Sequence, residues 1–206
     1  MIVDIDPTEP ESWLVARAAE VLRKGGVAII PTDTVYGLAC GISHAKAIKR
    51  IYELKDMDPK KPLAILVNEM TTIGQYAKGV TTPYYRLLKR VLPGPYTFIF
   101  EASAEVPKIM LRKRRTIGVR MPDHPITLAL LAELDEPLLT TSVRTPDDHW
   151  VIEPVEVEST LDHRVDVVVD GGPLVESPST VVDLSGDTPV LVREGKGSVE
   201  NLELFD

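Results

Sequence analysis

Apolar residues along the chain alternate between helical spacing and short unbroken runs. From 14 to 22 they recur on one helical face, and a pair of glycines then ends the pattern. The segment Thr8-Glu9-Pro10-Glu11 has the spacing of a capping box with proline in the first turn, so the pattern predicts a helix over about 10–24. Residues 27–30 are all apolar and stop at Pro31, which predicts a strand buried on both faces.

Helical and strand-like segments continue to alternate along the rest of the chain. Residues 31–41 are predicted as a loop, and Ser43 is predicted to cap a helix whose last turn carries Lys55. Further helices are predicted at 69–78, 82–91 and 124–134, and further strands at 63–67, 96–100, 116–120, 138–142, 165–170, 179–184 and 189–193. With no internal repeat and no flexible linker, this order predicts one α/β domain with a mixed sheet over residues 1–206.

The composition mainly excludes classes of protein. No window holds the roughly 20 unbroken apolar residues that a membrane helix needs, and the first residues lack the basic flank and apolar run of an export signal. A single cysteine, Cys40, rules out an intramolecular disulfide and leaves too few thiolates for a structural zinc site, so a small buried hydrophobe is its expected role. We therefore expect a cytoplasmic protein that does not contact membranes.

The charge balance is acidic overall and basic in one place. Against 31 aspartates and glutamates stand 23 lysines and arginines, a net charge of −8 that should repel nucleic acid from the chain as a whole. Anion binding must therefore depend on local clusters. Arg112-Lys113-Arg114-Arg115 is one such cluster, with Arg120 five residues further on, although a solvated loop explains the same residues.

Standard nucleotide and metal motifs are absent. Lys196-Gly197-Ser198 resembles the end of a phosphate-binding loop, but Val190 stands where that loop needs its first glycine. Asp147-Asp148-His149 is the one combination that resembles a metal clip, and a polar surface turn is the commoner explanation of such a run. Motifs of this kind therefore do not assign the class of protein.

Hydroxyl side chains gather where predicted strands begin or end. Thr32, Asp33 and Thr34 follow the strand at 27–30, Thr140-Thr141-Ser142 ends another strand, and Ser179-Thr180 opens a strand that leads toward Arg193. Ligands of open α/β sheets bind at such strand ends. Together with Lys55 and Arg120, these residues predict a pocket for a small carboxylate next to phosphate oxygens, provided that the fold brings them together. Taken singly, each hydroxyl cluster is more often a cap or a turn.

The same residues lie in segments that resemble the YrdC/YciO family, whose best-known members are L-threonylcarbamoyladenylate synthases. Pro31-Thr32-Asp33-Thr34-Val35-Tyr36-Gly37-Leu38 resembles the signature Pro-Thr-(Asp/Glu)-Thr-Val-Tyr-Gly-Leu of that family. The resemblance continues in order over about 165 residues, through Lys55, Pro62-Leu63, Pro93-Gly94-Pro95-Tyr96-Thr97, Thr116, Val119-Arg120-Met121-Pro122, His124-Pro125, Ser142, Ser179-Thr180-Val181 and Arg193 with Gly195.

The resemblance implies a fold, a reaction and a set of roles. The fold is a twisted open sheet with flanking helices and a concave, positively charged groove. The synthases join bicarbonate to the amine of L-threonine and transfer the carbamate to ATP, giving threonylcarbamoyl-AMP and pyrophosphate for tRNA modification. By this resemblance Thr34, Arg120 and Ser179 hold the amino acid, whereas Lys55, Thr116, Ser142 and Arg193 line the nucleotide. ATP enters with Mg²⁺ as a substrate, and no tightly bound cofactor is expected.

Three departures from the family pattern bear on the substrate. Met57 replaces an arginine, Arg144 replaces an asparagine, and Leu66 lies on the strand where synthases carry a histidine. Lys61 and Arg144 are expected to approach the phosphates from other directions instead. The sequence thus resembles the YciO branch, for which a nucleotide or anion pocket is implied and the substrate is threonine or another small carboxylate.

Two other functions stay open at this point. In the first, the groove holds RNA, with the basic run 112–115 on its rim; the family resemblance implies affinity for tRNA or double-stranded RNA. Such binding would weaken steeply as salt rises, whereas a small-ligand pocket would respond weakly. In the second, the pocket residues are structural remnants and the protein has a role that does not use the pocket. ATP with Mg²⁺ would then leave the thermal stability of the protein unchanged.

Overall fold

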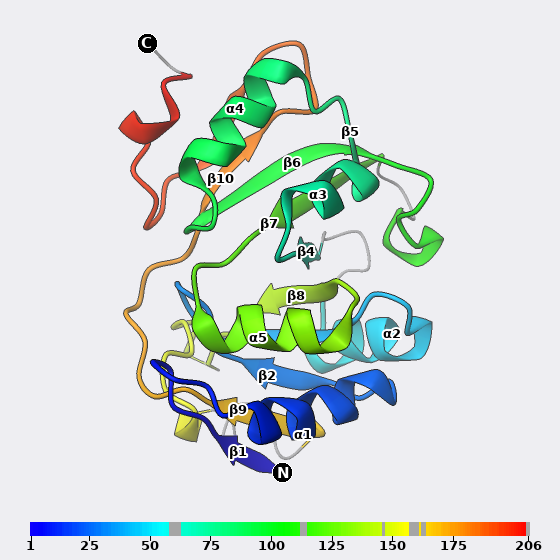
Figure 1. Cartoon of the computed structure of the whole chain (residues 1–206), viewed down its shortest axis with the longest axis vertical. Helices are drawn as coiled ribbons and strands as arrows, with labels where there is room; N and C mark the ends of the chain where they lie inside the picture. The colour runs from blue at the N-terminus through cyan, green and yellow to red at the C-terminus, as the bar shows by residue number, and fades with distance from the viewer. Residues whose placement is uncertain (58–62, 112–114, 146, 157–160, 162–163, 205–206) are drawn as a thin grey trace.

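The computed structural model describes residues 1–57, 63–111, 115–145, 147–156, 161 and 164–204. These residues form a single α/β domain built on one mixed sheet (Figure 1). Its strands are β1 (Ile2–Asp4), β2 (Ala28–Ile30), β3 (Gly37–Gly41), β4 (Ala64–Leu66), β5 (Ala77–Lys78), β6 (Tyr96–Ala102), β7 (Thr116–Arg120), β8 (Leu138–Ser142), β9 (Val167–Asp170), β10 (Thr180–Asp183) and β11 (Val190–Arg193). Their order in the sheet is β1-β9-β2-β3-β8-β4-β7-β6-β10-β11, with β5 paired to β6.

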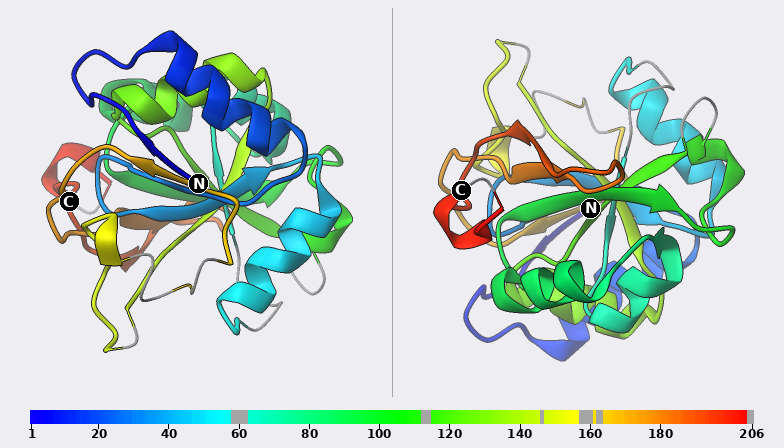
Figure 2. Two further views of the ribbon diagram at one scale, coloured as in Figure 1. Left: turned by 90° about the horizontal axis from the view of Figure 1, so that it is seen from below. Right: turned by 90° about the horizontal axis from the view of Figure 1, so that it is seen from above.

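The helices cover both faces of this twisted sheet unequally. They are α1 (Ser12–Arg23), α2 (Ala45–Leu54), α3 (Met70–Tyr76), α4 (Thr82–Val91) and α5 (Pro125–Leu134), with short 3₁₀ turns η1 (Lys108–Leu111) and η2 (Glu200–Leu202). Helices α1, α3, α4 and α5 lie on one side of the sheet, and α2 lies on the other (Figures 1 and 2). None of the helices within the described ranges has the length and apolar character needed to cross a membrane.

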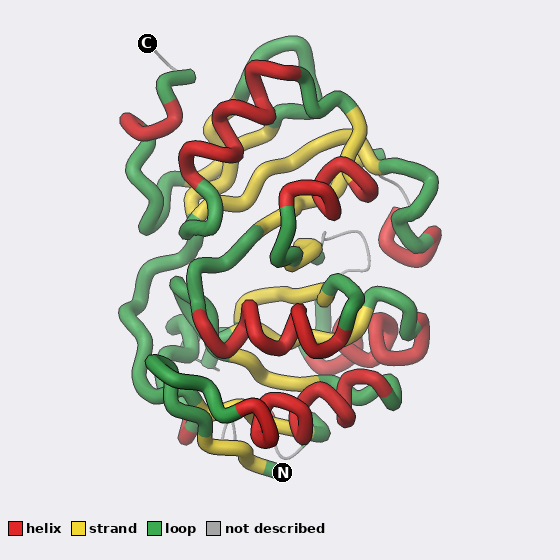
Figure 3. Tube along the Cα trace, in the orientation of Figure 1, coloured by secondary structure: helices red, strands yellow, loops and turns green. Residues whose placement is uncertain are grey.

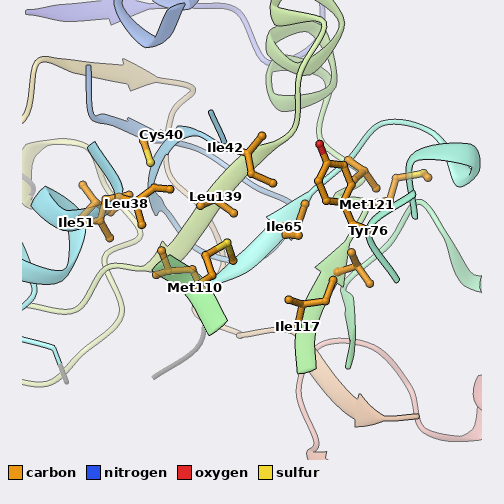
Figure 4. Packing of buried hydrophobic residues seen from close by; sticks show 14 of the residues in the cluster. Leu38, Cys40, Ile42, Ile51, Ile65, Tyr76, Met110, Ile117, Met121 and Leu139 are labelled. Carbon is orange, nitrogen blue, oxygen red and sulfur yellow. The ribbon is translucent and has the colours of Figure 1, made fainter. Parts of the chain in front are cut away.

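Buried aliphatic side chains hold the layers together. Helix α2 buries Ile48 and Ile51 in a cluster with Leu38 and Cys40 of β3 and with Leu139 of β8; Figure 4 shows side chains of this cluster from neighbouring strands close together. On the other side, the apolar face of α1 packs with α5 and with Val3 of β1. Cys40 is fully buried, as predicted, and burial raises the pKa of its thiol to about 12.

The structure corrects one prediction close to the candidate site. Residues 31–41 are not a loop throughout, because Gly37–Gly41 forms β3, which is buried along its whole length between β2 and β8. Gly37 keeps this packing close, because a Cβ there would lie 2.6 Å from the hydroxyl of the buried Thr140 on the neighbouring β8.

Three further predictions at element boundaries were wrong, and one strand was not predicted. Helix α1 begins at Ser12 without a side-chain cap, because the Thr8 hydroxyl donates to Asp6 instead of capping the helix. The cap position of α2 is His44 rather than Ser43, and it makes no side-chain cap bond either. The helix predicted at 69–78 ends at Tyr76 because the chain turns into β5, which pairs with β6. Strand β1 was not predicted, since only three residues pair with β9.

A long connection between β9 and β10 joins the two ends of the sheet. It runs along one side of the molecule as a loop over residues 171–178 (Figure 3). The buried Tyr36 fixes its start, because the tyrosine hydroxyl donates to the carbonyl of Gly172 at 2.7 Å and accepts from the amide of Gly171 at 3.1 Å. The loop delivers Ser179 to the start of β10, where it meets the end of β11.

Candidate functional site

Two adjoining cavities lie along the central strands. The first, here called the outer cavity, has a volume of about 770 Å³ and lies between the end of α2 and the segment that follows β8. The second, the inner cavity, has a volume of about 250 Å³ and lies over β4, β6, β7, β8 and β10. Thr141, Ser142 and Arg193 line both cavities, so the two form one site with two compartments.

Arg120, the last residue of β7, lines the inner cavity with a side chain that is only 7% exposed. One guanidinium nitrogen, Nη2, donates to three oxygens of the loop after β2: Oδ1 of Asp33 at 2.5 Å, Oγ1 of Thr34 at 2.7 Å and Oγ1 of Thr32 at 3.2 Å. The Nε atom is buried and has no hydrogen-bond partner among the described residues. The loop thus holds the arginine through a single nitrogen of its guanidinium.

Ser179 and Arg193 also line the inner cavity, where they contact each other. The Arg193 guanidinium donates twice to the carbonyl of Ser179, at 2.8 and 3.0 Å, and once to its hydroxyl at 3.2 Å. The hydroxyl of Ser179 also bonds that of Thr97 at 2.9 Å. Burial, followed by the positive charges of Arg120 and Arg144, lowers the pKa of Arg193. Three guanidinium groups from separate parts of the chain therefore act on one another electrostatically in this cleft.

The other residues predicted for the nucleotide are distributed over the two compartments. Lys55 follows α2 and lines the outer cavity, where its ammonium donates to the carbonyl of Ser142 at 2.8 Å. Thr116 begins β7 and lines the inner cavity. Arg144 lines the outer cavity, where it contacts Asp148 and Trp150. Lys61 and the basic residues 112–114 lie outside the described residues, so the predicted RNA-binding rim stays a prediction.

Thr34 lies behind Arg120 rather than on the wall of the inner cavity. It is 1% exposed and lines a third cavity of about 350 Å³, together with Asp33, His124 and Lys196. Burial lowers the pKa of His124, against the opposing effects of Asp33 and Asp123, and Lys196 lowers it further. The Lys196 ammonium donates to the carbonyl of Asp33 at 2.5 Å, which ties the segment after β11 to the loop after β2.

The three departures from the family pattern have different positions. Met57 and Arg144 both line the outer cavity. Leu66 is fully buried in the cluster between the sheet and helices α1 and α5, and it lines neither compartment. Only the first two are therefore placed to act on a ligand directly.

The metal clip considered for Asp147-Asp148-His149 has no counterpart in the structure. Asp148 forms an ion pair with Arg144 at 2.5 Å, and hydrogen bonding to that arginine lowers the pKa of the Asp148 carboxyl. Over the part of the chain that the structure describes, no three His, Cys, Asp or Glu side chains are grouped as a metal site would require.

Sequence reasoning missed three side chains that help to build the site. Asp33 was noted only as part of a polar turn. It follows β2, and its partner Arg120 ends β7, with β3, β8 and β4 between the two strands in the sheet, so nothing in the sequence indicated this ion pair. Thr97 lies on β6, and its contact with Ser179 depends on the register of β6 with β10. Trp150 carried no signal in the sequence, because only the pairing of residues 144 and 150 brings it into the cleft.

Together, the mixed sheet and the two adjoining cavities lined by arginine, lysine and hydroxyl side chains define a class of α/β proteins with a cleft over the middle of the sheet. A family model covering Sua5, YciO and YrdC proteins, described as telomere recombination, matches residues 20–195. The chain belongs to this Sua5/YciO/YrdC family.

Relatives with closely similar sequences fall into two groups. The Escherichia coli protein YciO is 39% identical over 198 residues, covering 95% of this chain and 96% of YciO. Threonylcarbamoyl-AMP synthase from Mus musculus is 35% identical over 192 residues, covering 89% of this chain and 68% of the mouse protein. The family therefore includes both proteins like YciO and enzymes that make threonylcarbamoyl-AMP.

Solved structures agree with the family assignment. The crystal structure of E. coli YciO superposes with a TM-score of 0.92 at 38% identity, covering 98% of each chain. The crystal structure of Pyrococcus abyssi Sua5 complexed with L-threonine gives a TM-score of 0.93 at 30% identity, covering 98% of this chain and 60% of Sua5. The single mixed-sheet fold predicted from the sequence is thus confirmed.

Proposed function

We propose that this chain is an ATP-using enzyme that activates a small amino acid in a reaction related to threonylcarbamoyl-AMP synthesis. The observation that carries the proposal is the pair of adjoining cavities, which share Arg193 and contain Arg120 in one compartment and Lys55 in the other. Relatives named threonylcarbamoyl-AMP synthase support it, as does the similarity to a Sua5 structure complexed with L-threonine.

The inner cavity has the chemistry for a small carboxylic acid. All the hydrogen bonds that Arg120 makes within the described residues come from Nη2, so N–H groups of its planar guanidinium, the buried Nε among them, are left for a carboxylate, and the buried position would strengthen that contact. Ser179 and Thr97 offer hydroxyls to the hydroxyl or amine of the same molecule. Ala64, Ile99 and Val181 make the rest of the wall apolar, so the volume of about 250 Å³ suits an amino acid with a short side chain.

The outer cavity has the chemistry for the nucleotide. Lys55 and Arg193 lie where the phosphates would bind next to the inner cavity. In the proposed reaction the amine and bicarbonate combine to a carbamate with loss of water. A carbamate oxygen then attacks the α-phosphorus of ATP, and pyrophosphate leaves with its Mg²⁺. This chemistry depends on alignment and charge neutralisation rather than on a protein nucleophile.

Ligand binding tests this assignment most directly. We expect L-threonine and ATP with Mg²⁺ each to release or absorb heat on titration into the protein. Pyrophosphate release should require ATP, the amino acid and bicarbonate together. The substitution Arg120→Lys keeps a positive charge opposite Asp33 but loses the planar fork, so it should weaken amino-acid binding by roughly thirtyfold or more while ATP binding persists.

The matched control is Arg86→Lys, which changes an exposed arginine on α4 far from the cavities. Thermal unfolding of each variant checks that the fold is intact. The proposal fails if neither ATP nor any small amino acid binds at millimolar concentration, or if Arg120→Lys binds the amino acid as tightly as the control does.

A further inference from the structure

A stacked pair of side chains forms one wall of the outer cavity. After β8 the chain makes a short hairpin in which Arg144 pairs with Trp150 in antiparallel fashion. Backbone bonds from the amide of Val151 to the carbonyl of Val143, and from the amide of Val143 to the carbonyl of Tyr36, tie this hairpin to the buried part of the fold, each at 3.0 Å. The two side chains are therefore held at the rim by ordered backbone.

The guanidinium of Arg144 lies over the indole ring of Trp150. Its central carbon is 3.9 Å from the ring centroid, and its Nη1 donates to Asp148 at 2.5 Å. The charge of this arginine is thus already balanced by a carboxylate, and one of its faces is covered by the ring. Arg193 differs, because its hydrogen bonds within the described residues all go to the uncharged Ser179.

The two ends of the outer cavity therefore suit different parts of a ligand. Arg193 and Lys55 lie toward the shared wall with the inner cavity and carry charge for phosphate oxygens. Arg144 and Trp150, with Met57 and Leu161 in the same lining, present flat and apolar surface. Planar heteroaromatic rings stack favourably on both indole and guanidinium faces, irrespective of which base they belong to.

We propose that Arg144 and Trp150 form the seat of the nucleobase and are specificity-determining residues that select nucleoside phosphates over phosphates without a base. The inference rests on the proposed nucleotide site and adds to it the group that holds the base. Arg144 acts here as a stacking surface rather than as a phosphate ligand, which differs from the role that the sequence predicted for it.

The chain contains two tryptophans, which allows a direct optical test. Trp13 lies on α1, 67% exposed and away from the cleft. The variant Trp13→Phe leaves Trp150 as the one tryptophan, and we expect AMP and ATP to quench its emission, whereas magnesium tripolyphosphate should not. Trp150→Phe, which keeps only Trp13, is the matched control and should show no quenching with any of the three.

Binding measurements then assign the contribution of each side chain. Trp150→Leu should weaken ATP binding by roughly tenfold, as expected for the loss of one base stack, and should change tripolyphosphate binding by less than about twofold. Arg144→Gln should likewise weaken ATP more than tripolyphosphate. Equal weakening of both ligands by Arg144→Gln would identify Arg144 as a phosphate ligand and overturn its stacking role.

The results separate this inference from the proposed function. If ATP binds to Trp13→Phe without quenching, and Trp150→Leu binds ATP normally, the base lies elsewhere while the nucleotide site stands. If neither ATP nor tripolyphosphate binds to Trp13→Phe or to the unmodified protein, the nucleotide site and the base seat are both refuted.

Discussion

The ion pair between Asp33 and Arg120 is the interaction on which the inner cavity depends. Both side chains are more than nine-tenths buried, at 8% and 7% exposure, and their nearest atoms are 2.5 Å apart. Replacing Asp33 with alanine leaves a buried guanidinium without a counter-charge. We expect this substitution to destabilise the fold and to expose how strongly the loop after β2 holds the arginine.

The contacts of Arg120 set the expected loss of stability in Asp33→Ala. Removing one partner of a buried pair costs about 3–5 kcal/mol of unfolding free energy. Two hydroxyl oxygens, on Thr32 and Thr34, still accept from the same nitrogen of Arg120, so the lower end, about 3 kcal/mol, is the expected loss. For a chain of this size, that loss corresponds to a fall in Tm of roughly 6–12 °C.

A double-mutant cycle in urea is the appropriate measurement. Asp33→Ala and Arg120→Met should each lower the midpoint of unfolding, whereas the double variant removes both charges and should lie within about 1 kcal/mol of the unmodified protein. Glu53→Ala breaks an exposed pair with Lys49 on α2 and serves as the control, with an expected loss of no more than about 0.5 kcal/mol.

Additive losses of unfolding free energy in the two single variants would refute this reasoning. If the two single losses sum to the double loss within about 0.5 kcal/mol, the two charges do not stabilise each other. A loss of less than about 1 kcal/mol for Asp33→Ala would show that the two threonine hydroxyls alone hold Arg120.

Two more predictions concern the remaining cavities. Burial lowers the pKa of His124 in the folded protein, so the stability that its neutral form contributes is present above pH 6.5 and is lost as the pH falls through that value toward the folded pKa. The substitution His124→Gln should therefore flatten the dependence of Tm on pH between about 7 and 5, whereas the control His149→Gln should not. An unchanged slope in His124→Gln would contradict this prediction. The substitution Met57→Arg adds a guanidinium to the outer cavity. It should tighten the binding of ATP, measured by titration, by about tenfold relative to the binding of AMP. An equal effect on both nucleotides would show that the new charge does not contact the β- and γ-phosphates.

The sequence indicates which charged and hydroxyl residues lie where strands begin or end, but not the strand directions that bring them together. In the structure a hydrogen bond joins Thr34 to Arg120, and another joins Ser179 to Arg193. Ser179 precedes β10 whereas Arg193 ends β11, so the two meet because these strands are antiparallel. The positions of strand ends therefore predict candidate residues, and strand direction decides which of them meet.

What the sequence could not supply depends on pairing between distant segments. Residues 37–41 form a strand because they pair with β2 on one side and with β8 on the other, and the second of these partners is about a hundred residues away in the sequence. In the same way, Trp150 and Thr97 become site residues only through the partners that the sheet register and the hairpin give them. Hydrophobic periodicity carries no information about such partners.

The position of Arg193 on β11 has a consequence for how damage at this edge of the sheet is felt. Strand β11 pairs with β10 at one edge, and its Arg193 lines both cavities. Proteolytic removal of residues 190–193 would leave the pairing of the central strands in place but would take away the cation that the two cavities share. Loss of ligand affinity would then report a cut at this edge before the rest of the fold is affected.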